Sequence, residues 1–197
     1  MEICGPLLPG RGGVVVSTRE PDGGRTMASD HGVAGQLSPD ALDPEWIGTA
    51  DVLHVSGYSL LRQPAAEAAI AAARLARRVT VDLASAHDIE RFGRDRFAEL
   101  VRALGPELVF ANQAERAVVP DLEVAWVIKL GPRGAIFPEG EFASETAVVV
   151  DTTGAGDALA AGYLTGGPRL AIAAAARCVA NIGALPPGRD FSASDTI

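Results

Sequence analysis

The segment VVVDTTGAGDALAAGYL, at residues 148–164, places one acid on each side of a glycine-alanine-glycine turn. Gly154 and Gly156 let the backbone approach a ligand closely, because they carry no side chain. The free N–H groups of a helix that begins there attract an anion. Asp157 would then stand beside this anion, where a carboxylate is unfavourable unless it takes a proton from an incoming hydroxyl. The pattern predicts a phosphate-binding turn with a catalytic base.

The simpler alternative is an ordinary helix start. Thr153 or Asp157 would cap the helix, and the two glycines would only make a turn. Capping needs a single polar residue, however, and leaves the second acid and the paired glycines unexplained. We therefore favour the phosphate-binding interpretation.

The elements that must position this turn alternate between strands and helices. Residues 13–18 and 25–29 flank Glu-Pro-Asp-Gly-Gly, which predicts a β-hairpin. Apolar runs further along predict buried strands, and alanine-rich or amphipathic stretches predict helices. The predicted strands are 52–57, 79–83, 107–112, 125–131, 135–137 and 148–150, and the predicted helices are 64–78, 94–104, 158–164 and 169–183. This order is typical of parallel βαβ units in an α/β layered fold.

Composition excludes several classes of protein. A chain of 197 residues with 48% hydrophobic and 21% charged residues has the make-up of one globular domain. A formal net charge of −8 gives no footprint for nucleic acid or an anionic membrane. Cys4 and Cys178 have no spacing that suggests a disulfide framework or a zinc site. Because the chain has neither a membrane-length apolar run nor the pattern of a signal peptide, we expect a soluble, cytoplasmic protein.

With these residues in view, DTTGAGDALAAGYL resembles the carboxy-terminal signature of the ribokinase-like (PfkB) carbohydrate kinases. Other elements follow in that family's order: PDGGRTM resembles its lid, VLHVSGYSLL its post-lid strand, ANQAE its Asn-x-x-Glu motif and KLGPRG its nucleotide-side turn. The resemblance implies a ribokinase-like fold with a largely parallel central sheet flanked by helices. It also implies a single kinase domain over residues 1–197, amino-terminally truncated, with residues 13–29 as the lid hairpin.

The resemblance implies a role for each matching residue. Asp157 would be the catalytic base, with the anion hole formed by Gly154, Ala155 and Gly156. Asn112 and Glu115 would organise Mg²⁺ and the phosphates, Glu115 through water, although alone they also fit a helix cap and a first-turn acid. The nucleotide would be lined by Lys129, Gly131 and Gly134. Asp151 and Thr153 match positions that contribute to a monovalent cation site, K⁺ in the simplest case.

The sequence also departs from the family pattern. The family's amino-terminal portion, which binds the sugar, has no counterpart in this sequence. DHGVAGQL stands where the family often has Gly-Ala-Asn, so Ala34 replaces a polar side chain. The segment between Glu115 and Ala125 is too short for the helix usually found there. The identity of the sugar is therefore open.

The implied activity is transfer of the γ-phosphoryl group of ATP to a hydroxyl of a sugar or related polyol. The alternative is a pseudokinase or truncated remnant that holds a nucleotide and acts as a binding module. An NAD-binding domain is a poor match, because no GxGxxG follows a first strand. The implied partners are a small-molecule substrate and a second copy paired through the lid hairpin, with no nucleic acid and no membrane.

Overall fold

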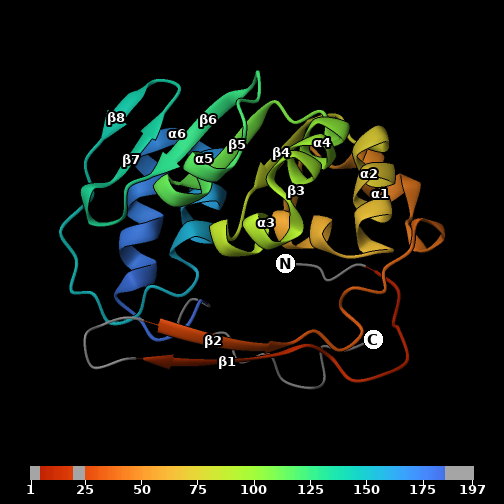
Figure 1. The fold of residues 1–197 in the computed structure, drawn as a ribbon. Helices are drawn as coiled ribbons and strands as arrows, with labels where there is room; N and C mark the ends of the chain where they lie inside the picture. Colours follow the sequence, from red (N-terminus) through yellow and green to blue (C-terminus); the bar gives the residue numbers. More distant parts are fainter. Residues whose placement is uncertain (1–4, 20–24, 185–197) are drawn as a thin grey trace. The chain divides into compact units, whose positions relative to one another are not determined.

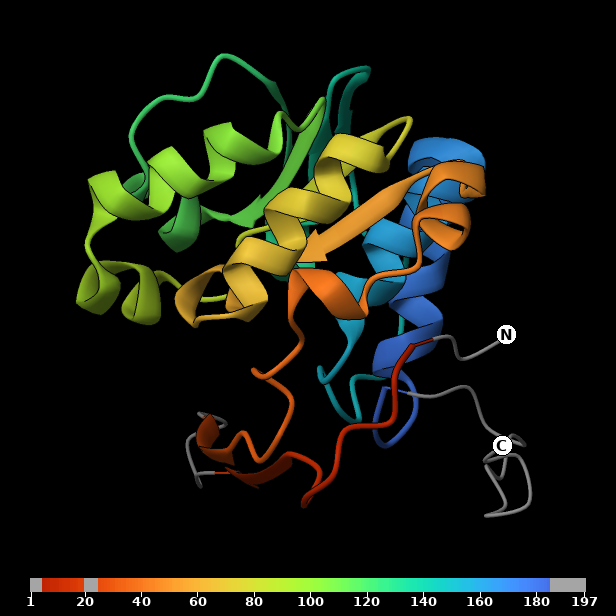
Figure 2. The same cartoon turned by 90° about the vertical axis from the view of Figure 1, so that its right-hand side faces the viewer.

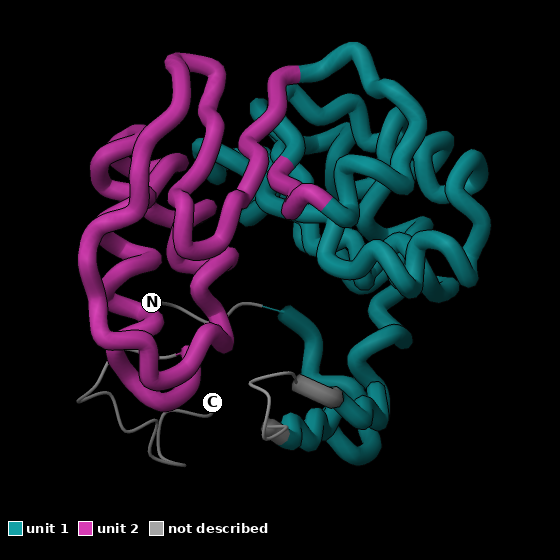
Figure 3. The backbone as a smooth tube through the Cα atoms, turned by 60° about the vertical axis from the view of Figure 1, so that its left-hand side comes forward, with its two compact units in different colours: residues 1–109, 114–124 teal, residues 110–113, 125–197 magenta. Residues whose placement is uncertain are grey.

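The computed structural model describes residues 5–19 and 25–184 (Figure 1). Cys4, the predicted turn at residues 20–24 and the tail from Pro186 lie outside the described residues. The backbone divides into two compact units (Figure 3). Unit 1 comprises residues 1–109 and 114–124, and unit 2 comprises residues 110–113 and 125–197. The single kinase domain expected over residues 1–197 stays a prediction.

Unit 1 begins with the predicted hairpin. β1 (Val14–Arg19) and β2 (Arg25–Asp30) pair antiparallel, with Val16 opposite Ala28. The elements that follow are η1 (Pro39–Ala41), α1 (Pro44–Thr49), β3 (Leu53–Ser56), η2 (Gly57–Leu61), α2 (Ala65–Leu75), β4 (Val79–Asp82), α3 (Ala86–Phe92) and α4 (Arg94–Leu104). β3 and β4 pair in parallel, as the alternation predicts.

The core of unit 1 follows from the spacing of apolar residues. α4 buries Phe97, Ala98, Val101 and Leu104, which recur at helical spacing along one face. The helix ends at Gly105, which adopts the left-handed conformation that favours glycine. All four residues of β4 are buried, as expected for a strand covered on both faces.

The strands run in the order β3-β4-β5-β6-β7-β8. Unit 1 holds β3, β4 and the start of β5 (Leu108–Asn112), while the rest of β5 belongs to unit 2 with β6 (Ala125–Lys129), β7 (Ala135–Phe137) and β8 (Gly140–Phe142). β7 pairs antiparallel with both β6 and β8. This mixed, mostly parallel sheet with flanking helices and a separate hairpin confirms the predicted fold class.

Unit 2 is organised around α6 (Ala155–Val179), which consists of two helical halves. Gly166 and Gly167 have non-helical dihedral angles, and Pro168 follows them, so the helix changes direction there (Figure 2). A Cβ built on Gly162 would lie 2.7 Å from the Cα atom of Ala171, so glycine is what lets the two halves approach. The chain therefore folds back after the turn at 166–168.

One predicted element is wrong. Residues 148–150 were expected to form a buried strand, but they have no strand structure, and Val148, Val149 and Val150 are 80%, 59% and 41% exposed. The backbone N–H groups of Val150 and Asp151 instead donate to the carbonyl of Val179, at the end of α6. β-branched side chains favour a strand, but a strand also needs a neighbouring strand to pair with.

As its shortness predicts, the segment between Glu115 and Ala125 has no separate helix and holds only the end of one that begins at Gln113. α5 (Gln113–Val118) starts directly at the end of β5.

Within residues 5–19 and 25–184, no helix has the length and apolar character needed to cross a membrane.

Candidate functional site

The start of α6 has the geometry that the glycine pattern predicts. Gly154 precedes the helix with φ +78°, and a Cβ built on it would lie 2.4 Å from the Cβ atom of Ala184. Only glycine fits both the dihedral angle and the space. The first intrahelical bond joins the Ala158 N–H to the Gly154 carbonyl, 2.8 Å away. The N–H groups of Gly156 and Asp157 therefore precede the helical ladder, the place where helices accept anions, whereas the Ala155 N–H donates to the Thr152 carbonyl at 3.3 Å.

Asp157 lies in the first turn of α6 and is exposed to solvent. An exposed carboxylate at this position can accept a proton from a hydroxyl brought to the same turn. The structure thus brings together Gly154, Ala155, Gly156 and Asp157 on consecutive positions of one helix start. Their roles as anion hole and base stay predictions.

Asp151 joins the turn to the far end of α6. One carboxylate oxygen accepts hydrogen bonds from the N–H and the hydroxyl of Thr153, at 2.9 and 2.8 Å. The other oxygen accepts from the N–H of Gly183 at 3.0 Å. The two residues proposed for a monovalent cation site therefore act together as a clasp, defined here as the Asp151 carboxylate with its contacts to Thr153 and Gly183.

Cys178 is a neighbour of the turn that the sequence analysis did not find. Its thiol donates to the carbonyl of Thr153 at 3.3 Å. Desolvation by burial raises the pKa of the Cys178 thiol, and the negative charges of Asp151 and Asp157 raise it further. Only the Gly-Gly-Pro sequence at 166–168, which predicts a break in the helix, pointed to this fold-back.

The predicted nucleotide-side residues lie at the end of β6. η3 (Gly131–Arg133) follows the strand, and the Gly134 N–H donates to the Gly131 carbonyl at 3.0 Å. Both glycines have positive φ, and a Cβ on Gly134 would lie 2.0 Å from the carbonyl oxygen of Phe142. These glycines are thus required by the turn itself. Lys129 reaches the start of α6, where its Nζ lies 3.4 Å from a Cβ built on Gly156.

Asn112 ends β5, and its neighbour Gln113 ties this strand to η3. The Gln113 side-chain oxygen accepts a hydrogen bond from Arg133 at 3.0 Å. In an open α/β sheet, ligands bind beyond the carboxyl ends of the strands. Unit 2 therefore holds Asn112, Lys129, the GPRG turn and the start of α6, all but one of the predicted site positions.

Glu115, the remaining position, belongs to unit 1. It lies in the first turn of α5 and is only 3% exposed. Desolvation raises the pKa of Tyr58, and the charges of Asp88, Glu115 and Asp82 raise it further, against a side-chain hydrogen bond with Ser85 that lowers it. Asp82, whose role the sequence left open, is buried and accepts a hydrogen bond from the Ala84 N–H at 3.1 Å.

The Glu115 carboxylate fits a magnesium ion that is held in part by its substrate. Among the described residues, no group of three or more His, Cys, Asp or Glu side chains could hold a metal ion. Mg²⁺ is usually bound through one or two carboxylates together with substrate phosphates and water. The buried Glu115 provides one carboxylate of this kind.

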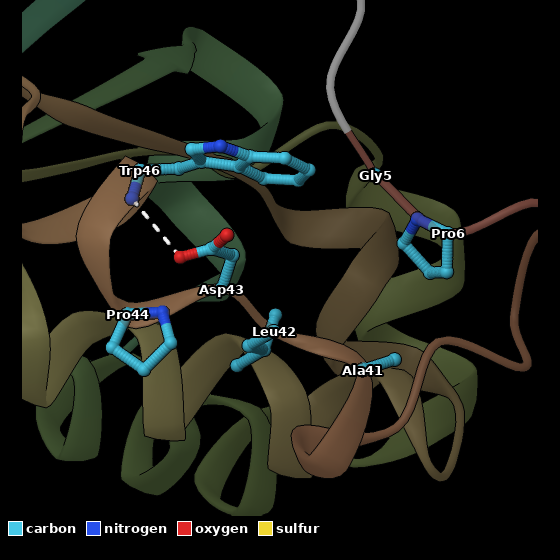
Figure 4. A pocket seen from close by; sticks show the side chains of 7 residues that line it. All are labelled: Gly5, Pro6, Ala41, Leu42, Asp43, Pro44 and Trp46. Atoms are coloured by element: carbon cyan, nitrogen blue, oxygen red, sulfur yellow. Dashed lines mark hydrogen bonds between the residues drawn. The ribbon is translucent and has the colours of Figure 1, made fainter. Parts of the chain in front are cut away.

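The structure also has two surface hollows, the second of which adjoins the turn before α6 through Cys178 and Gly183. One, of about 490 Å³, is formed around α1, where the Asp43 carboxylate accepts from the N–H groups of Glu45 and Trp46 as a helix cap (Figure 4). The other, of about 530 Å³, runs between the two halves of α6. Its lining includes five alanines together with Arg177, Cys178 and Asn181. Within the described part of the chain, no predicted site residue lines either hollow.

A mostly parallel sheet with flanking helices and a separate hairpin places the chain among the layered α/β proteins. Residues 10–185 match the model of the pfkB family of carbohydrate kinases, and the chain belongs to this family. The match confirms the resemblance seen in the sequence.

Solved structures support the same fold. Adenosine kinase from Sinorhizobium meliloti is 26% identical, with a TM-score of 0.79 over 89% of this chain and 63% of that one. A probable sugar kinase from Rhizobium etli CFN 42 is 26% identical, with a TM-score of 0.77 over 89% and 62%. A putative ribokinase II from E. coli, in complex with ATP and Mg²⁺, is 21% identical, with a TM-score of 0.67 over 82% and 63%.

The chain thus spans less than two thirds of the length of the two structures to which it is 26% identical. No curated protein matches its sequence.

Proposed function

We propose that this chain carries the phosphoryl-transfer site of an ATP-dependent kinase that phosphorylates a hydroxyl of a sugar or related polyol. The observation that carries the proposal is the start of α6. There the N–H groups of Gly156 and Asp157 precede the helical ladder, and the Asp157 carboxylate lies in the same first turn. Membership of the pfkB family supports the reaction class.

In the proposed reaction the acceptor oxygen forms a bond to the γ-phosphorus of ATP, while the bond from that phosphorus to the β-phosphate oxygen breaks and ADP leaves. Asp157 takes the proton of the acceptor hydroxyl. The N–H groups of residues 155–157 stabilise the charge that develops on the transferred group. The clasp of Asp151 keeps these groups in place before the reaction, because Thr153 is held on both its N–H and its hydroxyl.

ATP and Mg²⁺ are the proposed cofactors. The E. coli structure in complex with ATP and Mg²⁺ supports this assignment at the level of fold. When bound, Mg²⁺ would neutralise phosphate charge and orient the phosphates, with Glu115 as the proposed carboxylate, acting through water. For K⁺, Asp151 and Thr153 remain the proposed residues, and the hydrogen bonds of the clasp already use both Asp151 oxygens.

The acceptor is proposed only as a class. The two structures to which the chain is 26% identical are named as an adenosine kinase and a probable sugar kinase, so both nucleosides and free sugars belong in a substrate screen. The second candidate function is a nucleotide-binding module without turnover.

The deciding experiment uses a coupled assay for ADP release over a panel of pentoses, hexoses and nucleosides, with the full-length protein. We expect turnover of at least one acceptor, and we expect Asp157→Asn to reduce it by about 100-fold or more, the contribution of a general base. Nucleotide binding should persist in this variant. Asp95→Asn, at another exposed first-turn acid, is the matched control and should leave turnover unchanged.

The two outcomes separate the candidates. Nucleotide binding without turnover of any acceptor would favour the binding module. Turnover that survives Asp157→Asn would remove Asp157 as the base.

We further propose that the protein is cytoplasmic and forms a homodimer through β1 and β2. The exposed apolar side chains of Val14, Val15 and Val16 support this proposal.

A further inference from the structure

The two ends of α6 are tied to each other within unit 2. The carbonyl of Val179, the last residue of the helix, accepts hydrogen bonds from the N–H groups of Val150 and Asp151, at 2.7 and 3.2 Å. The Gly183 N–H donates to the Asp151 carboxylate at 3.0 Å. A return segment, defined here as residues 178–184, therefore holds the chain that leads into the proposed phosphate-binding turn.

The return segment also packs directly on the glycine of that turn. A Cβ built on Gly154 would lie 2.4 Å from the Cβ atom and 2.8 Å from the Cα atom of Ala184, closer than real Cβ atoms approach. The Cys178 thiol donates to the carbonyl of Thr153, the residue before Gly154, at 3.3 Å. Because the two segments are in direct contact, a displacement of one moves the other.

The position of the return segment is set at the opposite end of the two helical halves. There the helix is broken by a kink, defined here as Gly166, Gly167 and Pro168. A Cβ built on Gly162 would lie 2.7 Å from the carbonyl oxygen of Leu170, so the backbones of the two halves touch beside the kink. The hollow of about 530 Å³ lies between the halves. The kink therefore directs the second half, and with it the return segment.

We propose, on the basis of the function proposed above, that Gly167 is a positioning residue that holds the phosphate-binding turn through the return segment. Gly167 has φ +76° and ψ −168°, a region of backbone conformation that is essentially restricted to glycine. Nothing lies within 4 Å of a Cβ built on it, so an alanine would fit the space but strain the backbone. Relief of this strain turns the second half of α6 and pulls on the contacts of Val179 and Gly183.

Gly140 provides a matched control in the same unit. Its φ is +134°, and nothing lies within 4 Å of a Cβ built on it. It begins β8 and lies outside α6. Gly140→Ala therefore also strains the backbone of unit 2. If Gly167 served only the stability of the unit, both variants would have the same consequences.

The first measurement is amide hydrogen exchange by NMR, on the full-length protein without nucleotide. The reporters are the N–H groups that join the turn to the return segment, those of Val150, Asp151 and Gly183. In Gly167→Ala we expect them to exchange about tenfold or more faster, relative to the Leu130 N–H elsewhere in unit 2, because the strain of a glycine-only conformation opens these bonds locally. Gly140→Ala should leave this ratio unchanged.

A milder variant is Gly167→Asn, because asparagine tolerates positive φ better than alanine. It should change the same ratio in the same direction by a smaller factor, and it replaces Gly167→Ala if that variant does not fold.

The second measurement is isothermal titration calorimetry with ATP and MgCl₂. We expect Gly167→Ala to lower ATP affinity by about tenfold, since binding must first restore the geometry of the turn, and Gly140→Ala to lower it by about twofold or less. Combined with Asp151→Asn, Gly167→Ala should cost less than the product of the two single effects, because both changes act on one turn.

Equal exchange ratios in Gly167→Ala and Gly140→Ala would overturn the proposal. The exchange measurement needs no nucleotide, so its outcome is separate from that of the proposed function. Selective loss of protection in a protein that binds no ATP would support the role of Gly167 and reject the turn as a nucleotide site. ATP binding with equal exchange ratios in the two variants would do the reverse.

Discussion

At the scale of the residue, the candidate site depends on side chains that hold the backbone as much as on those that face a ligand. Asp151 illustrates this, because its carboxylate accepts from Thr153 twice and from Gly183 once. The second acid in the pattern thus has a physical explanation independent of any cation. It fixes the glycine turn by attaching it to the chain that follows α6.

We predict that Asp151→Asn loosens this turn. The asparagine amide presents a donor where the carboxylate accepted, so one of the contacts to Thr153 or Gly183 is lost, at a cost of about 1–3 kcal/mol in the free energy of unfolding. ATP affinity should fall with it, because the N–H groups of residues 155–157 lose their fixed geometry. Denaturant unfolding and nucleotide titration would measure the two effects.

The control is Asp43→Ala, at the cap of α1, which should lower stability without changing nucleotide affinity. Unchanged stability together with a lost response to K⁺ would instead identify Asp151 as a cation ligand.

At the scale of the element, Tyr163 joins α6 to the strands of unit 2. Its ring stacks on Phe137 at 5.1 Å between centroids and meets Phe110 edge-on at 6.0 Å. Its hydroxyl donates to the Glu139 carboxylate, with both oxygens 3.1 Å away. Desolvation and the bond to Glu139 raise the pKa of Tyr163 to about 12 from its ordinary value of 10.0.

This shift predicts a loss of stability at alkaline pH. The folded protein keeps the Tyr163 proton where the unfolded chain has lost it, so the contribution is complete below pH 10 and disappears as pH rises towards about 12. We expect Tyr163→Phe to flatten the dependence of unfolding free energy on pH within that window. Unfolding in urea at several pH values would measure this dependence. Glu139→Gln should change it less than Tyr163→Phe, because desolvation of Tyr163 remains. Identical pH slopes for Tyr163→Phe and the unaltered protein would contradict the assignment.

Local sequence predicted the elements best where the chain carries its own boundaries. α4 occupies residues 94–104 as expected, because Gly93 and Gly105 bracket an amphipathic run. The strand predicted for residues 148–150 was wrong. Three valines favour an extended backbone, but their presence does not show that a neighbouring strand is available to pair with them. The DTTGAGD segment identified the start of α6 and Asp157. It could not reveal Cys178 or Gly183 beside that turn, because those contacts depend on the fold-back at Gly166 and Gly167.

At the scale of the whole molecule, the predicted functions divide between the two units. Lys129, Asn112 and the start of α6 belong to unit 2, whereas Glu115 and the hairpin of β1 and β2 belong to unit 1. The residues proposed for phosphate binding and the residue proposed for metal binding thus belong to different units. This division is the physical reason for testing nucleotide binding and phosphoryl transfer separately.

The hairpin also carries a prediction about assembly. Val14, Val15 and Val16 are 48%, 59% and 56% exposed, and Met27 on the facing strand is 52% exposed. Successive side chains of a strand point to opposite faces, so both faces of this ribbon present apolar surface to water. A two-stranded hairpin has little stability by itself and gains from being covered. We therefore expect a second copy to pack on it.

Sedimentation velocity over a range of protein concentrations should show a dimer in equilibrium with the monomer. Val15→Lys places a charge in the centre of the proposed contact and should shift the protein to the monomer, because an unpaired ammonium group is costly to bury. Leu7→Lys, at a residue of unit 1 that is 81% exposed and outside the hairpin, should leave the equilibrium unchanged. A protein that stays monomeric at every concentration, or a dimer insensitive to Val15→Lys, would show that the hairpin does not mediate self-association.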